Sequence, residues 1–304
     1  MAVIDTYAPS ISPTDSPVQA LLKRFESAKS VKDLYKGEFE DCYEFALPQK
    51  ESFYDETQGR RRTDRIFDET AVVGVQEFAS RLQSGIVPNY SRWAEFKAGS
   101  EIPAEDKKEV DLLLDEVTEY VFELLQNSNF SQEIHESFLD IALGTGVLLV
   151  EEGDAVNPII FKAIPLPQVY LTSGYDDKVD HVFRERQIRA KEILIAYPDG
   201  VLSEEMKADM RGDPEKMCDI IEVVYRNHEN KKDDEYHYCV ISPEHEHKIH
   251  EEVYKGLGSN PFIVYRWSKC SGETYGRGPL QNLSLIHISE PTRQAEISYA
   301  VFCL

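Results

Sequence analysis

The spacing of apolar residues changes once along this chain of 304 residues, at Gly144-Thr145-Gly146. Before that point apolar residues recur three and four positions apart, as on one face of a helix. In Asp64 to Ser84, for example, they are Phe67, Ala71, Val75, Phe78 and Leu82. After it, short runs rich in β-branched and aromatic residues alternate with turns, as strands do. The sequence therefore predicts an α+β fold, with N-terminal amphipathic helices followed by short antiparallel strands.

The pattern divides the chain into four segments. We expect a flexible N-terminal arm (1–16), a helical region (17–145), a strand-rich mixed region of the same domain (146–282) and a non-native tail (283–304). Separate helices are expected over 17–29 and 31–47. The last four expected strands, which should form one antiparallel meander, are 219–226, 236–241, 248–254 and 262–267.

The charge of the chain limits its partners. It has 33 basic and 55 acidic residues, a formal net charge of −22, so it should repel DNA phosphates and anionic lipid. Tight wrapping of DNA by a basic groove is disfavoured, whereas an acidic wall past which DNA slides stays open. The N-terminus does not read as a secretory signal, and no apolar run is long enough to span a bilayer. The five cysteines show neither close pairs nor metal spacing, which suits a reducing compartment.

Catalytic patterns are weak throughout. Gly144-Thr145-Gly146 lies between a helix and a strand, the reverse of a phosphate-binding loop, and is better explained as a helix stop. Three histidines, His245, His247 and His250, could hold a metal but fit a solvated hairpin better. Paired carboxylates (176–177, 233–234 and 251–252) have the composition of solvated loops. We expect no enzyme activity, catalytic residue, cofactor or metal; an acidic metal-dependent nucleic-acid enzyme remains the less favoured alternative.

The one dense basic cluster consists of Arg60, Arg61, Arg62 and Arg65. Guanidinium groups at this density could bind phosphate or an acidic neighbouring subunit. The same residues would also serve as a solvated entry to the helix that follows. The cluster is therefore a candidate subunit interface, and a solvated entry to the following helix is the alternative.

Three stretches resemble the head-to-tail connector (portal) proteins of short-tailed phages. They are Arg65 to Trp93, Phe138 to Gly153 and Pro261 to Asn282. The motif residues are Trp93, Gly144, Gly146, Gly272, Glu273, Tyr275, Gly276, Arg277, Gly278 and Pro279, with the stretch from Gly272 to Pro279 the most specific. The resemblance covers nearly all of 17–282, which would correspond to about the first half of a typical member. Trp93 should be at least partly buried, docking the loop after the long helix.

The resemblance implies a structural role. Such proteins form a ring, generally of twelve subunits, at one vertex of the capsid, assembled in the host bacterial cytoplasm and retained in the virion. A packaging motor (terminase) pumps duplex DNA through the channel without tight binding, and scaffold, capsid and tail proteins contact the ring. The family offers no catalytic residues, and no membrane is involved. Another phage structural protein, such as a tail adaptor, is the nearest alternative.

The final segment, Leu283 to Leu304, resembles a translated sequencing adapter. Residues 283–293 match one adapter block and 297–304 a second, with three residues between them where an index would fall. We therefore leave it out of the fold argument, as one does with processing scars.

Overall fold

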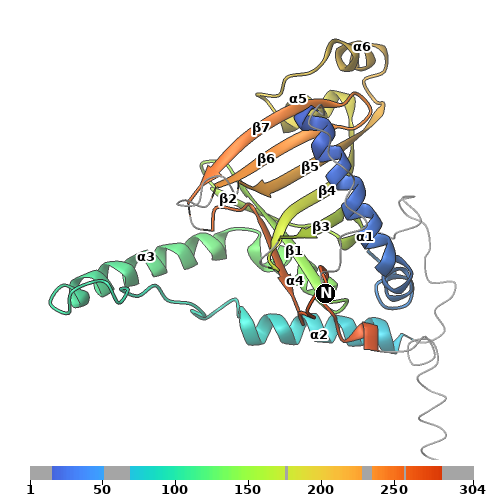
Figure 1. The fold of residues 1–304 in the computed structure, drawn as a ribbon. Helices are drawn as coiled ribbons and strands as arrows, with labels where there is room; N and C mark the ends of the chain where they lie inside the picture. Colours follow the sequence, from blue (N-terminus) through green and yellow to red (C-terminus); the bar gives the residue numbers. More distant parts are fainter. Residues whose placement is uncertain (1–15, 51–68, 175–176, 228–234, 257, 283–304) are drawn as a thin grey trace, which may run out of the picture. The chain divides into compact units, whose positions relative to one another are not determined.

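The computed structural model describes residues 16–50, 69–174, 177–227, 235–256 and 258–282 (Figure 1). The chain forms two compact units. Unit 1 comprises Met1–Asp41, Leu166–Phe262 and Lys269–Tyr275; unit 2 comprises Cys42–Pro165, Ile263–Ser268 and Gly276–Leu304. The long helices precede the strands along the chain, and the five strands of the larger sheet pair antiparallel, which confirms the predicted α+β class.

Unit 1 is built on a five-stranded antiparallel sheet whose strand order follows the sequence. Its strands are β3 (Val169–Ser173), β4 (Val179–Arg189), β5 (Met217–Arg226), β6 (Glu235–Ser242) and β7 (His247–Lys255). The connection from β4 to β5 carries the short helices η2 (Ala190–Glu192), α5 (Ile193–Ala196) and α6 (Glu204–Gly212). Three of the four expected meander strands are therefore confirmed as neighbours.

Both faces of this sheet are covered, which explains the apolar run in β5. Ile221 shares a core with Leu21, Phe25 and Ala28 of α1 (Pro17–Ala46). The adjacent Ile220 shares a second core with the α5 and α6 segment. Successive strand residues point to opposite faces, so neighbouring isoleucines serve two different cores.

The first helix differs from the prediction, because α1 is one continuous helix of 30 residues rather than two. A break was expected near Ser30, but the hydroxyl of Ser30 donates to the carbonyl oxygen of Glu26 at 3.0 Å. This bond to the preceding turn lets serine stay inside the helix. Residues of α1 as far as Asp41 belong to unit 1 and those from Cys42 to unit 2.

Unit 2 combines helices with a smaller sheet. Its helices, besides the end of α1, are α2 (Thr70–Ile86), α3 (Lys107–Asn127) and α4 (Phe130–Ile141). The sheet has the order β2 (Ile159–Ala163), β1 (Thr145–Glu152), β8 (Phe262–Arg266). The expected position of β8 in the meander was wrong, because β8 pairs with β1 instead of β7. After β7, Gly256 and Gly258 both have positive φ, a backbone conformation that does not continue a strand.

Among the helices that the structure describes, none is both long enough and apolar enough to cross a bilayer.

Candidate functional site

Two segments of unit 2 meet where the helical and strand-rich parts of the sequence join. One is the turn after α4, residues 142–146, and the other comprises Trp267 and residues 276–280. Three hydrogen bonds join them: Leu280 N–H to the Ala142 oxygen (3.0 Å), Trp267 N–H to the Gly144 oxygen (2.9 Å), and Gly276 N–H to Thr145 Oγ1 (2.8 Å). We call the group Gly144, Gly276 and Gly278 the glycine clasp.

Only glycine fits at the three clasp positions. A Cβ on Gly144 would lie 2.2 Å from the carbonyl oxygen of Gly276, and one on Gly276 would lie 2.1 Å from that of Gly144. A Cβ on Gly278 would lie 2.3 Å from the carbonyl oxygen of Ala142. Gly144 also has a φ of +122°, which side chains disfavour. The clasp is thus a close approach of two backbones far apart in sequence.

The other motif residues make local contacts within their own unit. A Cβ on Gly146 would lie 2.8 Å from the ring of Tyr265, so that ring fixes the start of β1. Arg277 N–H donates to the Ser268 oxygen at 2.9 Å, and Glu273 N–H donates to the Cys270 oxygen at 3.2 Å. Gly272 provides a turn with φ of +81°, and Pro279 is half-buried beside the clasp.

Tyr275, also from the motif, is fully buried in unit 1. Its hydroxyl accepts the N–H of Leu171 in β3 at 3.1 Å. Its ring lies against Tyr35 (5.4 Å between ring centres) and Phe39 (5.8 Å) of α1. Burial raises the pKa of Tyr275 far above its usual value, so the phenol stays neutral and anchors β3.

A buried ion pair lies at the end of α4, beside the clasp. The carboxylate of Asp140 is 1% exposed and accepts from the Tyr43 hydroxyl at 2.6 Å and from Lys50 Nζ at 3.0 Å. Both carboxylate oxygens are therefore engaged by the chain itself. Such a satisfied pair fixes neighbouring elements, here the end of α1 and the end of α4.

The loop after α2 lies along α3, and together they form what we call the α3 hairpin, residues 88–127. Trp93 is 41% exposed, and its ring lies edge-on to Phe122 at 5.4 Å between centres. It also stacks on Phe130 at 6.3 Å. More than half of the Trp93 surface is covered, and the residue docks the loop onto the helices.

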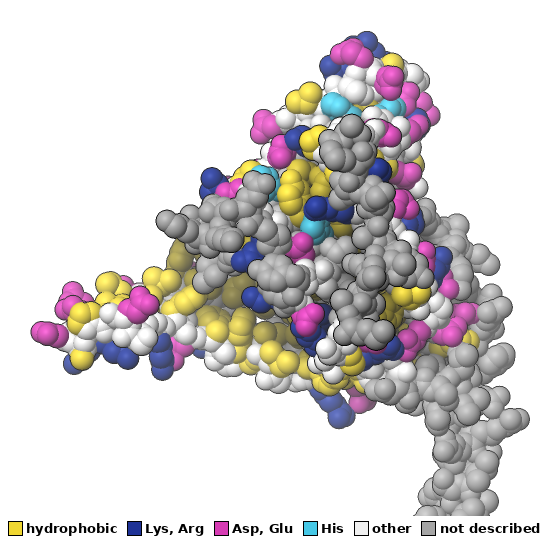
Figure 2. Space-filling model, in the orientation of Figure 1, with side chains coloured by type: hydrophobic (Ala, Val, Ile, Leu, Met, Phe, Trp, Pro, Cys, Tyr) yellow, Lys and Arg dark blue, Asp and Glu magenta, His cyan; other side chains and the backbone are white. Residues whose placement is uncertain are grey.

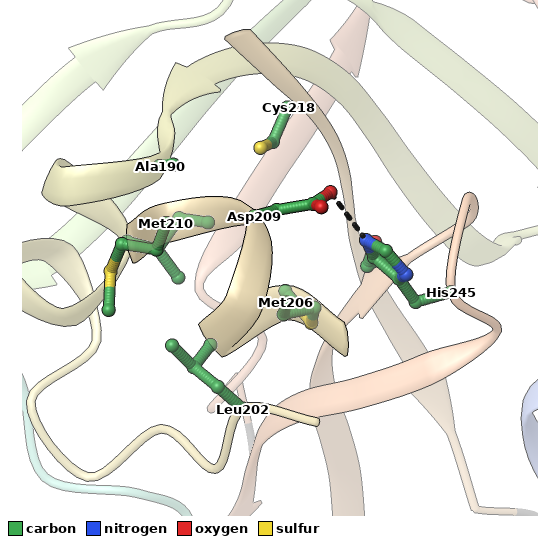
Figure 3. A pocket seen from close by; sticks show the side chains of 9 residues that line it. Ala190, Leu202, Met206, Asp209, Met210, Cys218 and His245 are labelled. Atoms are coloured by element: carbon green, nitrogen blue, oxygen red, sulfur yellow. Dashed lines mark ion pairs between the residues drawn. The ribbon is translucent and has the colours of Figure 1, made fainter. Parts of the chain in front are cut away.

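A pocket in unit 1 lies between α6 and the turn before β7 (Figure 3). Its apolar wall includes Leu202, Met206 and Met210. On its polar side, Asp209 and His245 face one another, 3.7 Å apart.

Asp209, His245 and Glu244 are close enough together to hold a cation. Lys216 Nζ, however, lies 2.7 Å from Asp209 and 3.4 Å from Glu244. Its hydrogen bond holds the pKa of Asp209 below the usual value, so the chain supplies its own cation.

A family model for bacteriophage head to tail connecting proteins matches residues 18–284. The chain belongs to this family. None of the curated proteins searched matches the chain. Membership assigns a structural role in joining phage head to tail, and hence a place in the virion. Three of the motif glycines of this connector protein, Gly144, Gly276 and Gly278, build a backbone contact, the clasp.

The structure brings some of the candidate residues together and places others far from them in the fold. Gly144, Gly276 and Gly278 come together in the clasp, whereas Tyr275 lies in the core of unit 1 and Trp93 in the α3 hairpin. The arginines proposed as a subunit interface (60–62 and 65) and the adapter-like tail lie outside the described residues. His245 lies in the turn before β7, where it pairs with Asp209. His247 lies in β7 itself, and its Nε2–H donates to the carbonyl oxygen of Val201, 2.7 Å away.

Two lysines that are largely removed from solvent were not anticipated from the sequence. Lys50 pairs with Asp140, and Lys32 of α1 donates to the carbonyl oxygens of Leu166 and Pro167 at 2.7 and 2.5 Å. Lys32 also lies 4.0 Å from the ring centre of Tyr170, and burial holds its pKa well below the usual value. Neither lysine has a distinguishing sequence context, since lysines at helix and loop positions are normally solvated.

Proposed function

We propose that this connector protein is a portal subunit: twelve copies form a ring at one capsid vertex, and its channel passes DNA during packaging and ejection. The observation that carries this proposal is the family match over 18–284, which spans all the described residues except Ser16 and Pro17. Within that span, residues 17–282 act as one portal-like domain and 283–304 are foreign to it.

The charge of the chain supports the channel role. A net charge of −22 gives few sites that could neutralise DNA phosphates, so duplex DNA would move past the ring without being held. The partners would be the terminase motor during packaging in the host cytoplasm, the scaffold and capsid around the ring, and tail proteins afterwards. None of these contacts requires a catalytic residue, a cofactor or a membrane.

The architecture of each unit fits a structural subunit. One buried carboxylate in each unit is held by the chain itself: Asp140 by Tyr43 and Lys50, and Glu222 by the Tyr197 hydroxyl at 2.6 Å and Arg186 at 2.8 Å. Buried carboxylates whose oxygens have partners stabilise a fixed framework. A ring under load from DNA packaging needs such a framework.

Mass photometry and negative-stain electron microscopy of the protein expressed from its complete gene test the proposal. We expect closed rings of one uniform size at micromolar concentration. A protein that stays monomeric across the concentration series would contradict the portal assignment and favour an adaptor that joins a ring made by others.

The competing assignment is a metal-dependent enzyme, and the cluster of Asp209, Glu244 and His245 is the observation in its favour. A metal would first have to displace the Lys216 ammonium from two carboxylates. Isothermal titration with Mn²⁺ or Zn²⁺ separates the two assignments. Binding that strengthens in Lys216→Met but is undetectable in the unmodified chain fits an internal ion pair; tight binding by the unmodified chain fits an enzyme.

A further inference from the structure

Strand β2 is an outer strand of the smaller sheet, whose order is β2-β1-β8. Just after β2, Ile164 N–H donates to the Val147 oxygen at 3.0 Å, on the side of β1. Residues of a strand turn their backbone groups alternately toward one neighbouring strand and toward the other. The backbone groups of Lys162 therefore face β1, whereas those of Phe161 and Ala163 face the side that no strand occupies.

Side chains from the start of α4 occupy this open side of β2. The Asn129 amide donates to the Phe161 oxygen at 2.7 Å and accepts the Phe161 N–H at 2.9 Å. Four residues later, the Glu133 carboxylate accepts the Ala163 N–H at 2.7 Å. Asn129 thus supplies the donor and the acceptor that the backbone of a further strand would supply. We call Asn129 and Glu133 the β2 edge caps.

The sequence of β2 makes an uncapped edge hazardous. The strand reads IIFKA, with three consecutive strand-forming apolar residues and a single charge at Lys162, which pairs with Glu151 of β1. An apolar edge with unpaired backbone groups is a template for pairing with another chain. Four of the five β2 residues are only partly buried, so the strand lies near the surface of unit 2.

The outer strands of the larger sheet are protected by other means. β7 carries a row of charged side chains, and Figure 2 shows acidic and basic groups along this strand; they are Lys248, Glu251, Glu252 and Lys255. Charges on an edge strand discourage pairing with further strands. In β3, the Leu171 N–H donates to the Tyr275 hydroxyl at 3.1 Å. β2 has no such row of charges, so its protection depends on the hydrogen bonds of the caps.

We propose that Asn129 and Glu133 determine which surfaces copies of this chain use to assemble, by closing the β2 edge to the β2 strand of a second copy. An identical strand fits an open β2 edge, because antiparallel pairing about Phe161 sets the N–H of each copy opposite the C=O of the other. Such a two-fold pairing would compete with the specific contacts between subunits. The inference does not rest on the proposed ring, since an open edge would join monomers and closed assemblies alike.

The first test uses Asn129→Ala with Glu133→Ala in the protein expressed from its complete gene. The matched control is Gln132→Ala, an exposed position in the same turn of α4. In a dilution series by mass photometry, the double variant should form species twice the unmodified mass and larger, in proportions that rise with concentration. The control should match the unmodified protein.

A double variant with native circular dichroism and an unchanged mass distribution overturns the inference. The outcome for the portal proposal is separate. An unmodified protein that is monomeric contradicts the ring, while dimers of the double variant would still support the caps.

Hydrogen exchange tests the caps without relying on the double variant to fold. In the unmodified protein the amides of Phe161 and Ala163 should be protected, and Glu133→Met alone should speed exchange at Ala163 by roughly fivefold to tenfold, the effect of one lost hydrogen bond. Glu133→Gln keeps an acceptor oxygen and should restore the protection. Self-association of the Glu133→Met variant should then slow exchange at Ala163 again as the concentration rises. Exchange at Phe161 and Ala163 that is fast in the unmodified protein, or unaffected by Glu133→Met, overturns the inference.

Discussion

Gly144 and Gly276 pack backbone against backbone, so close that a Cβ on either would lie within 2.2 Å of the other's carbonyl oxygen. The two residues are far apart in sequence, yet both occur in the stretches that resemble connector proteins. Their contact joins the turn after α4 to the segment after β8. The family motif in this chain is therefore a requirement of packing.

Replacing Gly276 with alanine should destabilise the protein by about 3 kcal/mol, since overpacking against rigid backbone typically costs 1–3 kcal/mol or more. Gly74→Ala is the matched control in the same unit, because a Cβ there would meet nothing within 4 Å. Alanine in that helix interior should stabilise by up to about 1 kcal/mol. Urea unfolding of both variants measures the difference; a Gly276→Ala effect no larger than that of the control would show that the clasp can relax.

Lys50→Met should cost about 3 kcal/mol, because it leaves the buried Asp140 carboxylate without its cation. Lys162→Met is the control: Lys162 pairs with Glu151 on the surface, where both side chains are more than a third exposed. Exposed pairs contribute roughly 0–1 kcal/mol. Chemical unfolding of the two variants should separate them clearly. Equal, small effects would show that water reaches Asp140.

Alkaline pH should destabilise unit 1 through Cys239. Burial, followed by the nearby charge of Glu251, raises the pKa of this thiol to about 12. The folded state therefore keeps the neutral thiol, whereas the unfolded chain ionises it near pH 8.5. The stabilisation is complete below that pH and is lost as the pH rises toward 12. Tyr225, whose pKa burial raises to about 12, acts in the same direction.

The measurement is the free energy of unfolding between pH 7 and 11 for the unmodified chain and Cys239→Ala. The slope above pH 9 should be shallower in the variant, though Tyr225 keeps it from vanishing. Identical slopes would show that the Cys239 thiol does not titrate differently in the two states. Iodoacetamide labelling at pH 8.5 gives an independent check, because Cys239 should react only after unfolding.

The order of helices and strands along the chain could be predicted from periodicity, but which strands pair with one another in a sheet could not. The strand at 159–163 and the residues of β3 to β7 follow from alternation and turn residues, because these signals are local. The pairing of β8 with β1 depends on contacts between segments that lie more than a hundred residues apart in the sequence, such as the one between Gly144 and Trp267. Similarly, nothing near Lys50 or Asp140 in the sequence indicates that they pair.

Trp93→Ala should destabilise unit 2 by about 1–2 kcal/mol, less than the 3–5 kcal/mol of a fully buried aromatic residue. The reason is that 41% of its surface is already exposed, while the rest contacts Phe122 and Phe130. Tyr90→Ala, in the same loop but 99% exposed, should change stability by less than 0.5 kcal/mol. Thermal unfolding of both variants provides the comparison. If the two effects are equal, Trp93 does not dock the loop.

The protein should not bind duplex DNA at physiological salt. Each phosphate contact requires a lysine or arginine, and 55 acidic residues oppose the 33 basic ones in the long-range field of the chain. In a mobility shift with a 30-base-pair duplex, no complex should form at 10 µM protein and 150 mM salt.

The arginines at 60–62 and 65 are the residues most able to overturn this expectation. Changing them to glutamate is therefore the control for any weak shift, and it should abolish that shift at low salt. Tight binding whose affinity falls steeply with added salt would contradict the channel role, because DNA held by the ring could not be pumped through it.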